Sequence, residues 1–483
     1  MTNKSTHIEK GDHNYKKDLQ HRHVQMIAIG GAIGTGLFLG AGGRLEKVGP
    51  SLALVYIFCG LIAFLVLRAL GEMVMHRPTS GSFVSYAREF LGEKGAYVAG
   101  WANFVNWTTT GIADATAVAL YFQYWNIGSA KTQWLVALIA LLFVTAINLL
   151  GVKYFGELEF WFAGIKVVAL LAFLLVGLWV LGARHQIDGH TPGFQLISSN
   201  GGFFPHGVLP AIMLSQGVIF AYAAIEVIGI TAGETENPHK VIPKAVNSVI
   251  WRIVIFYVGS VIILTMVLPW TAYSAGESPF VTFFDKLGIP GTAGIMNFVV
   301  ITAAMSSLNS GIYSNSRTLR NMGVNGTAPK ATTKMSDRGV PIGAVGFTLC
   351  FSVIGIILNY IVPSSAFEVV INLSSVAIIV MWCSILYAHI KFHKQVTAGK
   401  VAETSFKMPF APYSNWFALV SLIIIFIMSC FDYPVGLYTI AVAVPIIVIV
   451  LVIGWFKVRD NVDPHGSHYA EHQKKVEEEH LEL

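Results

Sequence analysis

Three ionisable side chains lie inside long apolar stretches of this chain. Glu226 lies in QGVIFAYAAIEVIGITAGETENP, Lys166 follows FWFAGI, and Asp114 lies in TTGIADATAV. A charge inside a membrane-spanning stretch is costly, and by default such a residue is a candidate for a functional site. These three side chains are therefore candidates for holding a polar ligand or for exchanging a proton.

A dense run of glycines marks the first apolar stretch. IGGAIGTGLFLGAGG occupies residues 29–43 and contains seven glycines. Each glycine inside a helix costs about 1 kcal/mol relative to alanine, so the run predicts a helix that is broken within its span. A continuous helix with a close-packing face is the alternative, because Gly30–Gly34 and Gly36–Gly40 each have GxxxG spacing.

The composition places these stretches in a membrane. Of the 483 residues, 54% are hydrophobic and only 12% are charged, whereas soluble domains have about 25% charged residues. Runs of about 20 nearly uncharged residues, the length that crosses a bilayer core, recur along the chain. The expected fold is therefore an all-α polytopic membrane protein. Hydropathy predicts twelve spans, at residues 24–45, 51–74, 96–123, 132–151, 157–182, 208–232, 248–269, 293–318, 342–361, 367–390, 414–430 and 435–456.

Lysine and arginine in the connecting segments predict the orientation. They are frequent in the amino-terminal tail and after the second, sixth, eighth and tenth spans. Such residues are enriched in cytoplasmic loops, so both termini are expected in the cytoplasm and the protein in the cell membrane. The net charge of +5 follows this topology and indicates no nucleic-acid partner. The opposite face has few basic residues, namely Arg44, Lys47, Lys131, Arg184 and Lys286.

The first and sixth spans are both interrupted, and they lie five spans apart. Because an odd repeat length reverses orientation, breaks at corresponding positions are typical of inverted-repeat transporters with a binding site near the midplane. Free amides at the first break favour a carboxylate, and free carbonyls at the second favour an ammonium group. These two groups define an α-amino acid. The predicted substrate-binding residues are Ile33, Gly34, Thr35, Gly36, Phe220, Ala221, Tyr222 and Ala223.

Lys166 and Asp114 are the candidates for proton coupling. Lys166 lies roughly 15 Å along the fifth span at 1.5 Å per residue, and a partly buried lysine loses its proton readily. Snorkelling of this side chain to an interface is the alternative. For Asp114, the alternative is a structural hydrogen bond to Thr109 or Thr110.

Polar residues in the sixth and eighth spans are candidates for gating or for support of the site. The eighth span reads MSSLNSGIYSNSR, and its hydroxyls and amides could ligate a cation or face the substrate. Polar packing between helices is the alternative for them. The residues in this group are Glu226, Ser306, Ser307 and Asn309.

Several longer motifs resemble the amino acid permeases of the amino acid–polyamine–organocation superfamily. They are IAIGGAIGTGLFLG followed by GP, SGSFVSYAREFLG, FGELEFWFAGIKV, FAYAAIEVIGITAGETENP, PKAVNSVIWRI and SSLNSGIYSNSRTLR, and they cover nearly the whole chain. The resemblance implies a leucine-transporter-type core of two inverted five-helix repeats, with two peripheral helices and alternating access. It also implies that Gly34–Gly36 contact the substrate carboxylate, that Phe220 covers the substrate, and that Lys166 couples a proton. The family often has glycine where this chain has Ala224.

The expected organisation combines the predicted spans, the distribution of lysine and arginine, and this resemblance. Residues 1–23 and 459–483 are cytoplasmic tails, residues 24–395 are the transport core with repeats at about 24–182 and 208–390, and residues 396–458 hold the last two helices. Within the connection at 75–94, SFVSYAREFLG leaves open a short interfacial helix or an ordered loop. No metal site is expected, including in the histidine-bearing carboxyl-terminal tail, because the spacing matches no common metal motif.

The function expected is secondary import of a neutral polar amino acid, with a proton as coupling ion and no cofactor. ALGEMVMHRPTSGSFVSYAREFLGEKGAYVAGW, NGGFFPHGVLPA and SAGESPFVTFF resemble the asparagine-transporting members of the family, whereas glutamine, serine or threonine remain alternatives. An exchanger and a solute sensor on a transporter scaffold are also open. An enzyme is disfavoured because the chain has no HExxH and no nucleophile elbow. A channel is disfavoured by the absence of repeated pore-lining motifs, and no GxxxxGK[ST] for ATP occurs.

Overall fold

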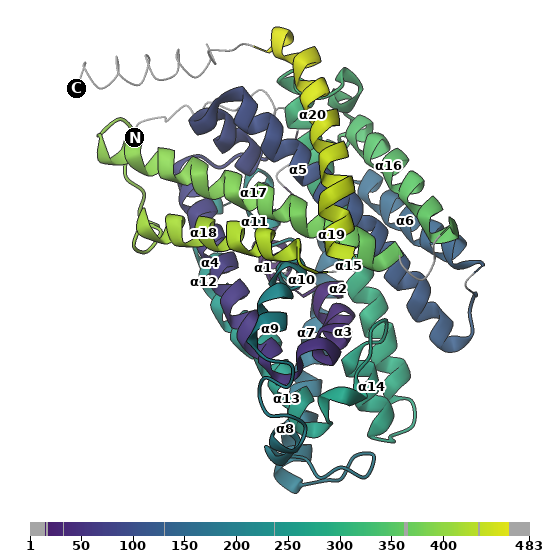
Figure 1. Cartoon of the computed structure of the whole chain (residues 1–483). Coiled ribbons are helices and arrows are strands. Elements are labelled where there is room, and N and C mark those ends of the chain that lie inside the picture. Colours follow the sequence, from purple (N-terminus) through teal and green to yellow (C-terminus); the bar gives the residue numbers. More distant parts are fainter. Residues whose placement is uncertain are drawn as a thin grey trace.

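The computed structural model shows a bundle of helices (Figure 1). It describes residue 15 and residues 18–31, 33–129, 131–235, 237–361, 366–432 and 435–462. Within these ranges the extended structure is limited to two isolated β-bridges, Leu19 with Thr235 and Ile187 with His190. The all-α class predicted from the sequence is therefore confirmed.

The helices of the first half include the three segments α1, α2 and α3 into which the first span is divided. Their bounds are α1 (His21–Gly31), α2 (Thr35–Phe38), α3 (Gly40–Val48), α4 (Leu52–His76), α5 (Ser82–Phe122), α6 (Gln133–Leu150), α7 (Val152–Ala183) and α8 (Gln195–Ser199).

The second half begins with the broken sixth span and contains two π-helical segments, η5 and η8. The bounds are α9 (Val208–Met213), α10 (Ser215–Ala221), α11 (Val227–Thr231), α12 (Pro238–Arg252), η5 (Ile253–Val258), α13 (Gly259–Val267), α14 (Pro279–Lys286), α15 (Thr292–Val324), α16 (Ile342–Ile361), α17 (Ala366–Thr397), α18 (Tyr413–Ser429), α19 (Val435–Tyr438), η8 (Thr439–Ala443) and α20 (Val444–Val458).

Seven helical segments of the described chain are long and apolar enough to cross a membrane, and three shorter apolar helices accompany them. The count of twelve spans, like the division into two repeats, stays a prediction. The seven segments are Gly40–His76, Gln133–Leu150, Val152–Ala183, Pro238–Val267, Thr292–Val324, Val370–Thr397 and Gly436–Val458.

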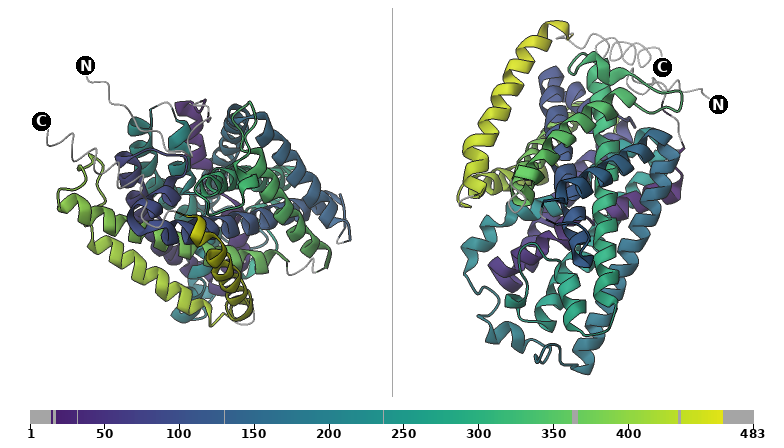
Figure 2. Two further views of the ribbon diagram at one scale, coloured as in Figure 1. Left: turned by 90° about the horizontal axis from the view of Figure 1, so that it is seen from above. Right: turned by 90° about the vertical axis from the view of Figure 1, so that its right-hand side faces the viewer.

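Helix α15 lies at the centre of the bundle and α20 at its edge. Helix α5 packs most extensively against α17 and α15, and α1 packs against α7. Among the candidate spans α15 is the most buried, although its sequence is rich in serine and asparagine, and α20 is the least buried. The right-hand view of Figure 2 shows α20 in yellow along one side of the molecule. A polar central helix is expected to line a functional site rather than to face lipid.

The segment SFVSYAREFLG is helical, as one of the two sequence alternatives predicted. It forms the start of α5, and the helix is kinked at Gly92, whose φ of 79° lies in the left-handed region. A glycine reaches this conformation without steric cost. The short helix at 82–91 therefore has its own direction, set apart from the membrane-spanning part of α5.

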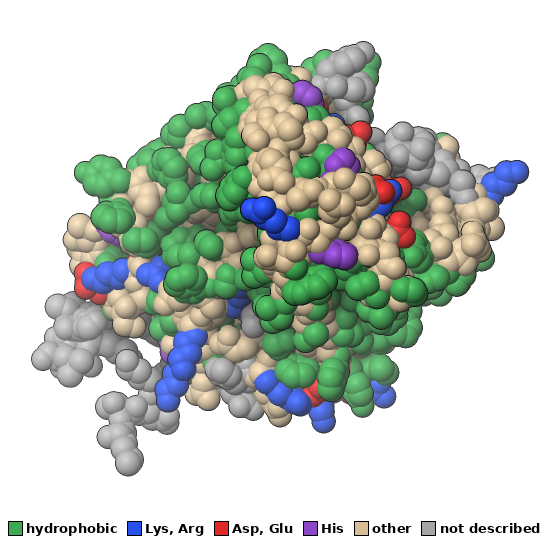
Figure 3. Space-filling view, turned by 90° about the horizontal axis from the view of Figure 1, so that it is seen from below, with side chains coloured by type: hydrophobic (Ala, Val, Ile, Leu, Met, Phe, Trp, Pro, Cys, Tyr) green, Lys and Arg blue, Asp and Glu red, His purple; other side chains and the backbone are tan. Residues whose placement is uncertain are grey.

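Arg44 was counted among the basic residues of the connecting segments, but it does not lie in a loop. It lies within α3 and is only 5% exposed. The first span continues past Gly40 as a helix to Val48, so this cation is drawn into the protein. In the view from below, hydrophobic side chains cover much of the surface and basic side chains are scattered (Figure 3).

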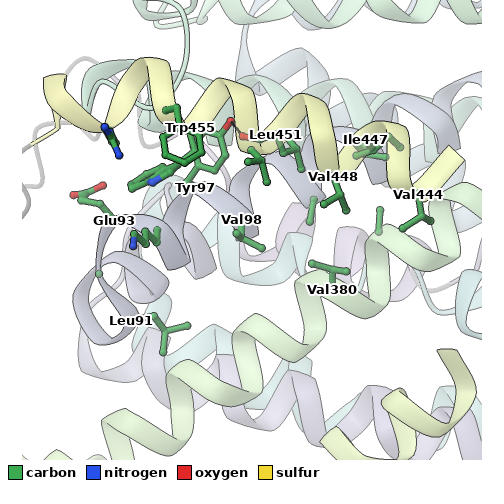
Figure 4. Close-up of a pocket in the computed structure, with 18 of the residues that line it drawn as sticks. Leu91, Glu93, Tyr97, Val98, Val380, Val444, Ile447, Val448, Leu451 and Trp455 are labelled. Atoms are coloured by element: carbon green, nitrogen blue, oxygen red, sulfur yellow. Dashed lines mark hydrogen bonds between the residues drawn. The ribbon is translucent and has the colours of Figure 1, made fainter. Parts of the chain in front are cut away.

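A groove with a volume of about 1000 Å³ separates α20 from the bundle. Its lining is mostly aliphatic, and Tyr97 and Trp455 project into it (Figure 4). The Tyr97 hydroxyl donates a 2.9 Å hydrogen bond to the carbonyl of Leu451 across the groove. None of the predicted site residues lines this groove, so it is separate from the candidate site described next.

Candidate binding site between two broken helices

The first span is broken between α1 and α2. Helix α1 ends at Gly31 and α2 begins at Thr35, while Gly34 is extended with φ of −125°. Within the described residues, the amides of Gly34, Thr35 and Gly36 donate to no backbone carbonyl. The broken helix predicted from the glycine run is thus present, and three free amides point to a site that an anion can occupy.

The sixth span is broken between α10 and α11. Residues Tyr222 to Glu226 form a turn that separates the two helices. At its centre Ala224 has a positive φ, in the left-handed region. A non-glycine residue adopts this conformation at a cost of roughly 1–2 kcal/mol. The backbone therefore takes at Ala224 the turn that a glycine would favour.

The two breaks lie against each other. A Cβ atom placed on Gly36 would be 2.4 Å from the Cα atom of Ala221, which is closer than real atoms approach. Only a glycine at position 36 allows this contact, because any side chain would collide with the backbone of α10. Residues that are 185 positions apart are in this way brought to one site.

The predicted acceptors for an ammonium group divide into two kinds. The Phe220 carbonyl accepts from the amide of Ala223 at 3.0 Å, and the Ala221 carbonyl accepts from the hydroxyl of Tyr257 at 2.7 Å. The carbonyls of Tyr222 and Ala223 accept no hydrogen bond from the described residues. Of the four predicted carbonyls, these two are therefore available to a ligand.

The side chains of Phe220 and Tyr222 are both buried, but only Tyr222 forms a side-chain hydrogen bond. The Tyr222 hydroxyl donates a 2.7 Å hydrogen bond to the carbonyl of Tyr56, and its ring stacks on Tyr257 with centroids 4.7 Å apart. Its hydroxyl is thus engaged within the protein and not free for a substrate side chain. Phe220 has no such polar anchor and is 3% exposed.

Asp114 lies at the first break. Thr35 donates a 2.7 Å hydrogen bond from Oγ1 to Asp114 Oδ1, and both residues are buried. Its other oxygen, Oδ2, has no hydrogen-bond partner among the described residues. The alternative partners, Thr109 and Thr110, bond instead to the carbonyl of Val105 and to Asn106 and Ser374. Asp114 is therefore part of the site and not tied to its own helix.

Lys166 reaches the same region from α7. Its amine donates hydrogen bonds to the carbonyl of Gly30 at 2.7 Å and to the hydroxyl of Ser306 at 2.8 Å. The residue is 1% exposed. The amine is thus held in the interior, and the snorkelling alternative is wrong.

Glu159 is a buried carboxylate that the sequence analysis did not single out. Its Oε1 lies 4.0 Å from the Lys166 amine and accepts a hydrogen bond from Ser306, and Asn309 donates to its Oε2 at 3.3 Å. The sequence spacing could have identified Glu159, because it precedes Lys166 by seven residues, which places both on one face of a helix two turns apart. The motif FGELEFWFAGIKV contains both residues.

The predicted polar residues of α15 separate into two groups. Ser306 and Asn309 contact the buried carboxylate of Glu159, and Asn148 donates to Asn309 at 2.8 Å. They support the charged pair, which agrees with the alternative of polar helix packing. Ser307 is partly exposed, and a Cβ on Gly34 would lie 3.9 Å from its hydroxyl. It is the serine of this pair that faces the first break.

Glu226 ends the turn of the second break and is fully buried. Neither carboxyl oxygen has a hydrogen-bond partner among the described residues, although the indoles of Trp107 and Trp382 lie nearby. A buried polar group without a partner is unusual in native proteins. Glu226 thus lies next to the second break, and its role in gating or support of the site stays a prediction.

A second buried ion pair lies just after α11, where Arg317 of α15 meets Glu234. Arg317 donates to Glu234 at 2.9 Å, and the Tyr313 hydroxyl donates to the same carboxylate at 2.9 Å. Tyr15, from the amino-terminal tail, lies over Arg320 with 4.8 Å between the ring centroid and Cζ. Burial raises the pKa of Tyr15 to about 12. Tyr15 therefore lies against this ion pair, a contact that the sequence motifs did not indicate.

Comparison with known proteins adds an independent line of evidence. The sequence model of a family described as amino acid permease matches residues 23–467. The chain is 57% identical to the L-asparagine permease of Escherichia coli over 451 residues, which cover 93% of this chain and 90% of that protein. It is 52% identical to the L-asparagine permease of Streptomyces coelicolor, over 94% of this chain and 93% of that protein.

Proposed function

The chain belongs to the amino acid permease family, and we propose that it imports L-asparagine across the cell membrane by proton-coupled alternating access. It is a multi-pass membrane transporter and not an enzyme. Asparagine is proposed because the relatives described above bear the name L-asparagine permease. We also propose that both termini are cytoplasmic, from the distribution of lysine and arginine.

The observation that carries the proposal is the contact between the two breaks. Free amides at Gly34–Gly36 and free carbonyls at Tyr222 and Ala223 meet where Gly36 touches Ala221. Amide donors attract a carboxylate and carbonyl oxygens accept from an ammonium group. In this proposal the substrate carboxylate binds the first set and its ammonium group the second, with Phe220 covering it and Ile33 lining the break.

The proposed coupling group is the amine of Lys166, with Asp114 as a second titratable group on the same break. Lys166 contacts the carbonyl of Gly30, the last turn of α1 before the break. Loss of its proton would remove one of its three N–H donors. The remaining donors must then serve Gly30, Ser306 and the nearby Glu159. Protonation of this amine would in this way act on the last turn of α1.

The test is uptake of radiolabelled L-asparagine by proteoliposomes under an imposed ion gradient. We expect accumulation when the outside is acidified relative to the lumen, without any need for sodium. Protein-free vesicles and a proton ionophore serve as controls. Accumulation that requires a sodium gradient and ignores the proton gradient contradicts the role given to Lys166.

Competition identifies the substrate in the same preparation. Each of the other common amino acids is added in excess at several pH values, and inhibition of asparagine uptake is measured. Unlabelled L-asparagine is included as the reference competitor, and we expect it to inhibit most strongly. A stronger effect of glutamine, serine or threonine reassigns the substrate within the same function, and uptake that occurs only against an internal amino acid indicates an exchanger.

A further inference from the structure

The guanidinium of Arg44 occupies a slot between the two broken spans. A Cβ on Gly40 of α3 would lie 2.8 Å from its Nη1, and a Cβ on Gly217 of α10 would lie 3.3 Å from its Nε. Two glycines, one from each broken span, thus make the room in which the guanidinium sits. Arg44 is 5% exposed.

Among the described residues, this buried cation has no anionic partner. Within the described part of the chain, Arg44 donates a 2.7 Å hydrogen bond from Nη1 to the carbonyl of Gly36, and its guanidinium forms no ion pair. Lys166 and Arg317, by contrast, each lie beside a buried glutamate. An arginine keeps its charge in proteins, and burial of an uncompensated charge is strongly unfavourable.

A purely structural role accounts for the hydrogen bond but not for the charge. Helix α2 ends at Phe38, so the carbonyl of Gly36 lacks a helical donor, and Arg44 supplies one. A neutral side chain could satisfy that carbonyl equally well. The buried hydroxyl of Tyr56, which has no hydrogen-bond partner among the described residues, also lies beside the guanidinium. These surroundings offer hydrogen bonds, yet no negative charge.

The position of Arg44 indicates which anion it meets. Arg44 lies two helical turns beyond Gly36, on the side of the break away from Lys166 and α1. In the proposed orientation this is the outer side. A substrate that moves from outside to the amides of Gly34–Gly36 passes this guanidinium first, and the α-carboxylate is the negative charge that every neutral amino acid carries.

We propose that Arg44 is an outer binding site for the carboxylate of the incoming amino acid. The guanidinium pairs with this carboxylate when the outer side is open, and it releases the carboxylate to the amides of Gly34–Gly36. It then bonds to the carbonyl of Gly36, the arrangement seen here, as α2 and α10 close together. The inference rests on the proposed function and adds a second ligand-binding step to it.

Charge selection follows from this step. A fixed positive charge on the outer path repels cationic side chains and gives no hold to amines that lack a carboxylate. Lysine and L-asparagine methyl ester should therefore be poor competitors of the wild-type protein. A variant without the charge should lose part of this discrimination.

Three variants test the proposal in proteoliposomes with radiolabelled L-asparagine outside. Arg44→Gln keeps a hydrogen-bond donor for Gly36 but removes the charge, and Arg44→Lys keeps the charge. Lys47→Gln is the matched control, because Lys47 is an exposed cation on the same helix. We expect Arg44→Gln to raise the KM for external asparagine by about tenfold, with a weaker salt dependence. Arg44→Lys should retain most of the affinity, and Lys47→Gln all of it.

Two further measurements separate this role from a structural one. Inhibition by lysine and by the methyl ester should increase in Arg44→Gln, and the thermal unfolding midpoint should stay near that of the wild type. An unchanged KM and unchanged selectivity in Arg44→Gln overturns the proposal. Equal loss of uptake in Arg44→Gln and Arg44→Lys, with lowered unfolding midpoints, also overturns it, because the residue is then a structural support.

The failure of this inference is distinguishable from failure of the proposed function. If the wild-type protein does not take up asparagine, the substrate assignment is wrong. The same three variants are then compared with the amino acid that the wild type does transport, since the argument depends on the α-carboxylate and not on the side chain.

Discussion

Thr35 donates a 2.7 Å hydrogen bond to Asp114, and this bond joins the break in the first span to the carboxyl-terminal third of α5. The threonine lies between two glycines whose amides are free. Its hydroxyl is therefore fixed by a partner from another helix while its backbone remains open to a ligand. The site is thus held in shape by side chains and left available through its main chain.

Removal of the Thr35 hydroxyl should weaken substrate binding. A hydrogen bond of this kind contributes about 1 kcal/mol, so Thr35→Ala is expected to raise the Kd for asparagine by roughly fivefold. Thr35→Ser keeps the hydroxyl and is the matched variant. Binding is measured by isothermal titration calorimetry in detergent. Equal affinities of the two variants contradict a role for the bond with Asp114.

Lys166→Ala should impair net uptake more than exchange. Exchange needs movement of the loaded site alone, whereas accumulation also needs the coupling proton. A coupling free energy of about 1–3 kcal/mol corresponds to a roughly 5- to 150-fold effect, and proton-driven accumulation should fall within this range. Counterflow of labelled asparagine between equal pools gives the comparison. Loss of both activities to the same degree indicates that Lys166 is structural.

Gly36→Ala should abolish asparagine binding, although alanine is the smallest possible addition. The new methyl group would lie 2.4 Å from the Cα of Ala221, and backbone cannot move aside as a flexible side chain can. Gly182→Ala is the control, because nothing lies within 4 Å of that position. Both variants should be recovered from the membrane fraction and should elute as a single peak in size-exclusion chromatography. Normal binding by Gly36→Ala would show that the two breaks do not close on each other.

Ala224→Gly should stabilise the protein or leave its stability unchanged. Glycine adopts the positive φ observed at this position without steric cost, which removes strain of roughly 1 kcal/mol. The control is Ala232→Gly, at a residue with a right-handed helical backbone, where glycine is expected to lower stability. The measurement is the thermal unfolding midpoint. A decrease for Ala224→Gly equal to that of the control contradicts the strain argument.

The sequence predicted the breaks but not all of the charges around them. The glycine run and FAYAAIE are local signals, so they could be read without knowledge of distant contacts. Lys166 and Asp114 were identified because a charge in an apolar span stands out. Which residues they contact depends on how α1, α5, α7 and α15 pack, and a linear pattern does not contain that information.

Arg44 and Glu159 show why prediction was incomplete. Arg44 lies near the predicted end of the first span, where a basic residue usually belongs to a loop, and only the continuation of α3 to Val48 buries it. Glu159 lies near the predicted start of the fifth span, where an acid normally faces water. Helix α7 begins five residues earlier than predicted, at Val152, and this places Glu159 inside. In both cases the burial of the charged residue depends on where the helix begins or ends, and hydropathy defines such boundaries poorly.

The contact between Lys166 and the carbonyl of Gly30 imposes a thermodynamic reciprocity on the transporter. If the protonated amine favours one position of α1, then that position of α1 must favour protonation by the same free energy. Proton affinity and substrate affinity would then both depend on the same equilibrium between positions of α1. A measured change in asparagine affinity with pH would, on this basis, give the change in proton affinity upon asparagine binding without a separate titration.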